Sequence, residues 1–302
     1  MTIDPRFVFS FFGYGLVFAV LAFAISGRWF KQRRLKAPME FKLLRGPGES
    51  LRRRLDKFED QFAFRMLAAA LAPLVAAALV LAMFFMQLPI PQRTLWIGVF
   101  LSVAVFLAGF IAALRWMAGN LRRYRSDRLG YLGEREVAEH LQTLCARGYV
   151  VFHDVPASSK RRFFNIDHVA VGPAGVVVIE TKTRRKGRSR TGRKEHIVSS
   201  DGRRLIWPWG EDQSNLKQAA SRAEWVREWI RERTGIETPV RPILALPGWF
   251  VETTARGAVA VVNPKLLPAE VERGATPAGE LSREQIDAIV VLLDDRCRDV
   301  VD

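Results

Sequence analysis

Three charged side chains at the ends of two apolar runs have the types and spacing of a metal-dependent catalytic site. The stretch NIDHVAVGPAGVVVIETKT, residues 165–183, carries Asp167 in its first run and Glu180 and Lys182 at the end of its second. Alternate side chains of a strand share a face, so Glu180 and Lys182 should point the same way. Adjacent carboxylates repel unless a proton or a cation is bound between them. The pattern therefore predicts that Asp167 and Glu180 bind a hard cation such as Mg²⁺, which prefers oxygen ligands.

A cation beside an ammonium group is suited to hydrolysis of a phosphate ester. Lys182 is expected to orient or deprotonate the attacking water, or to stabilise charge on the phosphate. Glu134 lies three residues before Val137 on a predicted helix, and so borders the face that packs on the sheet. We expect it as a third metal ligand. Gln213 is expected at the N-terminal end of a later helix, where exposed backbone N–H groups favour anions.

The elements that must position these residues form an α/β domain. Residues 131–148 have helical periodicity, and YVVFHDV, FNIDHVAVG and VVVIETK are strand-like runs. A turn at residues 173–175 should join the last two as a hairpin, with Asp167 beside Glu180. A second helix over residues 213–233, two further strands and a closing helix follow, with a small extra hairpin around HIVSSDGRRLIW. This order predicts a mixed sheet flanked by helices.

Two of these segments, with one further residue, resemble a known family. GEREV (residues 133–137), NIDHVAVGPAGVVVIETK (residues 165–182) and Gln213 resemble the nuclease-related domain, or NERD, family, which is assigned to the restriction-endonuclease-like PD-(D/E)xK fold. The resemblance covers about residues 127–240, and residues 241–302 are expected to complete the domain. Ile166 stands where the wider motif has proline, as is common in NERD domains.

The resemblance implies Mg²⁺-dependent hydrolysis of phosphodiester bonds, with Mn²⁺ as an alternative ion. Asp167, Glu180 and Lys182 match the metal-binding and catalytic positions, Glu134 the helix acid and Gln213 the helix glutamine. The family name records similarity to nucleases more than an established activity. A non-catalytic nucleic-acid-binding or partner-recruiting membrane scaffold with a nuclease-like fold is therefore the alternative function.

The N-terminal part of the chain predicts a membrane anchor over residues 1–126. The 302 residues carry a net charge of +15, yet 49% are hydrophobic. Three uncharged stretches, residues 7–27, 66–92 and 94–114, reach the roughly 20 residues that a membrane-spanning helix needs. They predict spans at about residues 7–27, 66–88 and 94–117. A cleaved signal peptide is the alternative for the first, but its apolar stretch is longer than usual. We read an anchor, and thus a multi-pass protein of the cell membrane.

Basic residues predict the orientation of this anchor and its partners. The loop over residues 28–65 is rich in Lys and Arg, which places it in the cytoplasm, with the N-terminus outside and the C-terminal domain inside. Anionic lipid of the inner leaflet accounts for this loop. Basic runs beside the candidate site are either solvated or bind the backbone of nucleic acid, DNA or RNA. Those candidate nucleic-acid-binding residues are Lys160, Arg161, Arg162, Arg184, Arg185, Lys186 and Arg188. The oligomeric state is left open.

Overall fold

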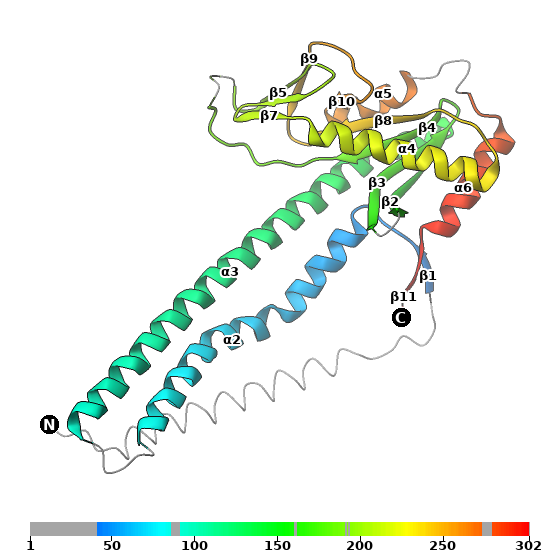
Figure 1. The fold of residues 1–302 in the computed structure, drawn as a ribbon. Coiled ribbons are helices and arrows are strands. Elements are labelled where there is room, and N and C mark those ends of the chain that lie inside the picture. The colour runs from blue at the N-terminus through cyan, green and yellow to red at the C-terminus, as the bar shows by residue number, and fades with distance from the viewer. Residues whose placement is uncertain are drawn as a thin grey trace. The chain divides into compact units, whose positions relative to one another are not determined.

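The computed structural model describes residues 41–85, 91–159, 162–190, 192, 194–273 and 280–301 (Figure 1). The first predicted span, residues 7–27, lies outside these residues, as do Lys160 and Arg161. The chain divides into two compact units. One contains Leu55–Arg125, and the other joins Met39–Arg54 to Ser126–Asp302. Met39–Arg54, which the sequence analysis assigned to the basic loop over residues 28–65, thus belongs to the same unit as the α/β domain.

Two long helices, α2 (Glu49–Phe85) and α3 (Gln92–Gln142), supply the first unit. Each contains a stretch that is long and apolar enough to cross a membrane, and only 17% and 11% of these stretches are buried. A core helix of a water-soluble protein buries much more of its apolar surface. The apolar stretches of α2 and α3 agree with the second and third spans predicted from the sequence. However, α3 continues as one helix to Gln142, so the predicted third span and the predicted helix of the α/β domain are a single element.

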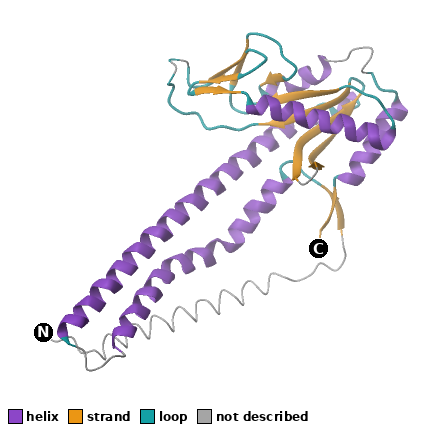
Figure 2. Ribbon diagram, viewed as in Figure 1, coloured by secondary structure: helices purple, strands orange, loops and turns teal. Residues whose placement is uncertain are grey.

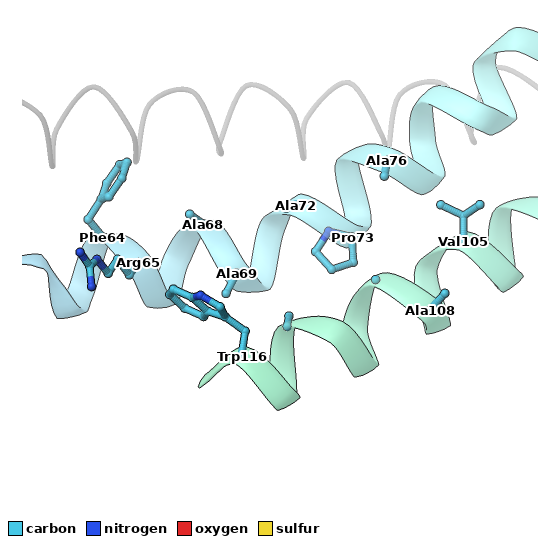
Figure 3. Close-up of a pocket in the computed structure, with 12 residues that line it drawn as sticks. Phe64, Arg65, Ala68, Ala69, Ala72, Pro73, Ala76, Val105, Ala108 and Trp116 are labelled. Atoms are coloured by element: carbon cyan, nitrogen blue, oxygen red, sulfur yellow. The ribbon is translucent and has the colours of Figure 1, made fainter. Parts of the chain in front are cut away.

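The first unit has an apolar groove between α2 and α3 (Figure 3). The groove has a volume of about 710 Å³, and Pro73 and Gly109 lie in its wall. A Cβ atom on Gly109 would lie 3.2 Å from Cβ of Pro73, tighter than an ordinary contact. Small residues allow such close approach of helices, as is common in membrane bundles.

A five-stranded mixed sheet forms the centre of the second unit, in the order β10-β8-β4-β3-β2. Strands β2, β3 and β4 are antiparallel neighbours, whereas β4, β8 and β10 are parallel. The mixed sheet predicted from the sequence is confirmed. Every residue of β4 is buried, as its apolar run predicts for a central strand. The strands are β2 (Val150–Ser159), β3 (Arg162–Gly172), β4 (Gly175–Thr181), β8 (Val240–Ala245) and β10 (Ala260–Val262).

Helices pack on both faces of this sheet. On one face, Val176 and Val178 contact a core to which α4 (Ser214–Thr234) and α6 (Arg283–Arg296) contribute. On the other, Val177 and Ile179 join the end of α3 and α5 (Leu267–Arg273). Figure 1 shows α4 lying along the sheet. Because strand side chains alternate, Glu180 lies on the same face as Val178, toward α4.

A second sheet, in the order β7-β6-β5-β9, is formed by residues that follow β4 in the sequence (its strands are orange in Figure 2). Its β5–β6 pair is the small hairpin that the sequence predicts. Trp207 and Trp249 are buried in its core at 1% exposure, so they pack the sheet and present no face to a ligand. The strands are β5 (Ile197–Ser200), β6 (Leu205–Trp207), β7 (Gly210–Asp212) and β9 (Phe250–Thr253).

A two-stranded sheet joins the two ends of the second unit. The strand β1 (Phe41–Leu44) pairs antiparallel with β11 (Arg298–Val301), which follows α6. Two short 3₁₀ helices, Cys145–Arg147 and Pro264–Leu266, complete the regular elements described. Pairing of β1 with β11 places the segment just before α2 in the same unit as the C-terminal strand, which no local sequence pattern indicates.

Candidate active site

The hairpin β3–β4 places Asp167 and Glu180 at equivalent positions on neighbouring strands. Its pairing runs from Gly172 opposite Gly175 to His168 opposite Ile179, and Asp167 and Glu180 come next on each strand. The predicted hairpin is therefore confirmed. The backbone N–H of Thr181, the last residue of β4, donates a hydrogen bond to Oδ2 of Asp167 over 2.7 Å. This bond fixes the orientation of the Asp167 carboxylate. Both acids thus meet where β4 ends.

The Glu180 carboxylate is buried, with 2% of the residue exposed, and its two oxygens differ in their surroundings. Its Oε1 accepts from Nζ of Lys182 over 2.8 Å and from Nε2 of Gln218 over 2.7 Å. Its Oε2 has no hydrogen-bond partner among the described residues. An unpaired buried carboxylate oxygen is costly, since it has lost water without gaining a donor. That oxygen is the atom best placed to bind a cation.

Lys182 continues β4 past its last assigned residue. Its backbone N–H donates to the carbonyl of Ala245 on β8 over 2.9 Å, which extends the parallel ladder by one step. Its side chain is 27% exposed, so the ammonium group contacts both Glu180 and solvent. This agrees with the shared face predicted for Glu180 and Lys182. The arrangement presents one ammonium group next to a buried carboxylate.

Glu134 reaches the acid cluster because the residue before it is glycine. A Cβ atom on Gly133 would lie 2.0 Å from Cγ2 of Thr183, so a larger residue fits there only if Thr183 or α3 shifts. Glu134 itself is buried. Burial, together with the charges of Asp154 and Glu180, raises the pKa of Glu134 to about 7. The Gly-Glu pair of the motif therefore has a steric and an electrostatic role.

Asp167 is the most strongly perturbed of the acids. Burial, then the charges of Glu180 and Glu134, raise the pKa of Asp167 well above its ordinary range. The hydrogen bond from Thr181 and the charge of Lys182 act in the opposite direction without cancelling this effect. Carboxyl groups this close cannot all ionise without a compensating cation. Ionisation of Asp167 and Glu134 is therefore disfavoured until a cation binds beside them.

The acids fit Mg²⁺ as a pair better than as a trio. Among the described residues, no three Asp, Glu, His or Cys side chains lie close enough together to hold one metal ion. Mg²⁺, however, is usually bound through one or two carboxylates and keeps several waters. Asp167 and the unpaired Oε2 of Glu180 supply such a pair. The geometry does not bring Glu134 into a three-ligand group with them, so its predicted role as a direct ligand stays a prediction.

A fourth acid, Asp154, was not singled out from the sequence. It lies opposite Asp167, between the pairs His153–His168 and Val155–Ile166 of β2 and β3. Its φ of 48° is in the left-handed region, where residues other than glycine are uncommon and often functional. The sequence feature that could have indicated Asp154 is the presence of an acidic residue within the apolar run YVVFHDV. Asp154, Asp167 and Glu180 therefore lie at matching positions on three adjacent strands.

The glutamine in contact with the acids is Gln218 and not Gln213. Gln213 is the exposed residue before α4, and its side chain makes no capping bond. Gln218 lies in the second turn and donates to Glu180. Arg222 lies four residues later on the same helix face. Burial lowers the pKa of Arg222, and the negative charges of Glu180 and Asp167 act in the opposite direction. The sequence feature that could have indicated Gln218 and Arg222 is that these two polar residues, four apart, interrupt the apolar face of α4.

The predicted basic surface is described in part. Lys160 and Arg161 lie outside the described residues, and the side chain of Arg162 is not described. Arg184 pairs with Asp212 over 2.8 Å and lies over the ring of Trp207. Arg185, Lys186 and Arg188 are exposed. Exposed cations immediately after the acid cluster are suited to a polyanion, but this arrangement is equally that of a solvated loop.

The fold and the site together define an α/β domain whose central strand ends in an acid-lysine cluster. Residues 129–247 match the family model of NERD, the nuclease-related domain. Residues 129–247 are therefore similar to a nuclease-related domain, over nearly the range that the sequence motifs predicted. No curated protein and no solved structure gives a significant match.

Proposed function

We propose that the protein is a membrane-anchored nuclease that hydrolyses phosphodiester bonds of nucleic acid with Mg²⁺, or with Mn²⁺ in its place. The observation that carries the proposal is the unpaired, buried Oε2 of Glu180 beside Asp167, with Lys182 on the other oxygen. The nuclease-related domain match supports it. We further infer that the mixed sheet is that of the restriction-endonuclease-like PD-(D/E)xK fold.

In this proposal, protein groups hold the acids and move the proton. Mg²⁺, when bound, would supply Lewis-acid polarisation of the phosphate and neutralise developing charge. The N–H of Thr181 orients Asp167, and Gln218 orients Glu180. Lys182, which is partly exposed to solvent, orients the attacking water or stabilises charge on the phosphate. Glu134, with a pKa of about 7, is suited to accept a proton near neutral pH.

The membrane part of the proposal rests on α2 and α3. Their apolar stretches are largely exposed, and large exposed apolar surface marks a membrane or protein contact. We propose that these helices anchor the chain in the cell membrane, with the N-terminus outside and the nuclease-related domain in the cytoplasm. We propose that basic residues of the segment over residues 28–65, among them the exposed Arg52, bind anionic lipid of the inner leaflet.

A non-catalytic scaffold that binds nucleic acid or recruits a partner is the alternative, and one observation favours it. Lys182 and Gln218 already satisfy Oε1 of Glu180, so part of the cluster is neutralised without any ion. A protein that only binds would keep such a network for stability. The difference between the two functions is whether a bond is cut.

Cleavage by the whole chain tests the proposal. The chain, in detergent micelles, would be incubated with labelled DNA and RNA in Mg²⁺, Mn²⁺ or EDTA. The whole chain is needed because Met39–Arg54 belongs to the unit that holds the site. We expect ion-dependent cleavage that Glu180→Gln abolishes and Glu139→Gln, an exposed acid on α3, leaves intact. Absence of cleavage of every substrate by the folded wild type would reject the nuclease and favour the scaffold.

A further inference from the structure

A cavity beside the acid cluster extends beyond the groups that the proposed hydrolysis uses. It has a volume of about 500 Å³, and Glu134, Asp154 and Asp167 form one side of it. Phe163 and Arg54 contribute to its remaining wall. Pockets that bind small ligands measure about 300–1,000 Å³. The cavity therefore has room for one nucleoside next to the carboxylates.

The first turn of α2 supplies part of this wall and is fixed there by Asp154. Oδ1 of Asp154 accepts from Oγ of Ser50 over 2.7 Å, and Oδ2 accepts from the backbone N–H of Ser50 over 3.0 Å. Arg45 adds an ion pair to the same carboxylate over 3.1 Å. A helix N-terminus favours an adjacent carboxylate, since its first N–H groups lack partners. The left-handed conformation of Asp154 thus directs its side chain at α2.

Arg54 lies one turn further along α2 and is a weakly paired cation at the cavity. Its guanidinium is 61% exposed, reaches Asp127 only at 4.0 Å, and donates from Nε to the backbone carbonyl of Ser50 over a long 3.4 Å, which leaves both Nη atoms directed at no closer acceptor among the hydrogen bonds of the described residues. Its charge acts to lower the pKa of Glu134, which places it within electrostatic range of the acid cluster. An exposed guanidinium with so little pairing is suited to bind a phosphate group in two-pronged fashion.

Phe163 is the most exposed large apolar side chain of the described residues, at 92%. Its neighbour Phe164 is used differently, since it packs against Trp225 and lies 3.6 Å from the guanidinium of Arg222. Only Phe163 therefore presents its ring to the solvent at the cavity. Aromatic rings beside a cationic group are the usual platform for stacking an unpaired base.

We propose that this cavity binds one nucleotide whose base is unpaired, with the base stacked on Phe163 and the adjacent phosphate bound by Arg54. Bases of a duplex have their faces covered by their neighbours, so they reach such a ring only after unstacking. The ligand class is therefore single-stranded nucleic acid. The inference deepens the proposed nuclease by naming its substrate class, but the binding it describes does not require cleavage.

Binding by the whole chain in detergent micelles tests this inference. Fluorescence anisotropy would compare a short labelled single strand with a hairpin duplex of the same composition. Every chain would carry Glu180→Gln, so that no strand is cut. We expect the single strand to bind more tightly than the duplex. Phe163→Ala should weaken single-strand binding about tenfold, because a stacked base contributes that much, and Phe163→Trp should restore it.

Matched controls separate this cavity from general charge and exposure. Phe250→Ala removes another exposed phenylalanine, on β9, and should leave binding unchanged. Arg54→Ala should weaken binding, whereas Arg283→Ala, at the exposed start of α6, should not. Equal binding of duplex and single strand, or binding unaffected by Phe163→Ala, would overturn the inference. Cleavage by the chain without Glu180→Gln is scored separately, so either proposal can fail alone.

Discussion

Gln218 of α4 and Lys182 of β4 bind the same oxygen, Oε1 of Glu180, over 2.7 Å and 2.8 Å. This shared contact leaves Oε2 of the same carboxylate buried and unpaired. It also links the helix face that covers the sheet to the end of the central strand. The orientation of Glu180 therefore depends on a glutamine five residues beyond the one that the sequence motif indicated.

Replacing Gln218 should impair the reaction more than replacing Gln213. Gln218→Ala removes a donor that orients a proposed metal ligand, and losing such a partner typically lowers activity about 10- to 100-fold. Gln213→Ala removes an exposed side chain with no capping bond, and should leave the rate near that of the wild type. The measurement is the ion-dependent cleavage rate of both variants. A larger loss for Gln213→Ala would mean that the motif, and not the contact, identifies the functional glutamine.

The raised pKa of Glu134 predicts how stability changes with pH in the absence of divalent ions. Its ordinary pKa is 4.5 and its folded pKa is about 7, so the folded domain keeps a proton that the unfolded chain releases. The stabilisation from that proton is complete below the lower value and is lost as pH rises through the higher one. In EDTA, Glu134→Gln should therefore melt above the wild type at about pH 8 and close to it at about pH 5.

Comparison of the two chains at each pH isolates Glu134 from other titrating groups. Glu136→Gln, an exposed acid on the same helix, is the matched control and should follow the wild type at both pH values. Addition of Mg²⁺ at the higher pH should raise the melting temperature of the wild type. If Glu134→Gln lowers stability equally at both pH values, the carboxyl is an ordinary hydrogen-bonding group.

The buried pair His153 and His168 predicts a loss of stability in acid. Their Nδ1 atoms lie 2.8 Å apart, and burial lowers the pKa of His153 to about 4. Burial also lowers the pKa of His168 well below its ordinary value. Both are neutral in the folded domain, so the stabilisation present above the ordinary value of 6.5 is lost as pH falls toward 4. His153→Gln, which can still bond His168, should make melting less pH-dependent in that range. His140→Gln, on the end of α3, is the control.

The site and the fold differ in how far the sequence determines them. The β3–β4 hairpin follows from local rules, because two β-branched runs and a short turn fix the register that pairs Asp167 with Glu180. The contact of Ser50 with Asp154 links residues 104 positions apart, so no local pattern contains it. Gln218 was missed because the residues that face the sheet depend on how α4 packs, whereas Gln213 was chosen from its place at the start of the helix and from the family resemblance.

The segment before α2 is the part of the domain that the sequence assigned elsewhere. Its basic residues were read as a loop facing lipid, but Arg45 pairs with both Asp154 and Asp299, and all three side chains are mostly buried. Charge composition indicates a cytoplasmic position and cannot reveal which buried acids a given arginine meets. The pairing of β1 with β11 explains why this segment folds with the C-terminal residues.

Removing Arg45 should therefore destabilise the domain far more than removing a surface arginine. Arg45→Ala leaves the buried carboxylate of Asp154 without its cation, which costs about 3 kcal/mol in the free energy of unfolding. Arg147→Ala breaks the exposed ion pair with Glu272 and should cost less than about 1 kcal/mol. Denaturant unfolding of the whole chain, followed by tryptophan fluorescence, gives both values. Equal effects would show that the Arg45 network does not hold the segment to the domain.

The central claim is that Asp167 and Glu180 together bind a divalent ion. Electron paramagnetic resonance of Mn²⁺ titrated into the whole chain measures this directly, because bound and free ions give different signals. We predict that the wild type and Glu139→Gln bind one ion, and that Asp167→Asn and Glu180→Gln each lose it. Binding that survives in both of these variants, or a folded wild type that binds no ion, would contradict the account.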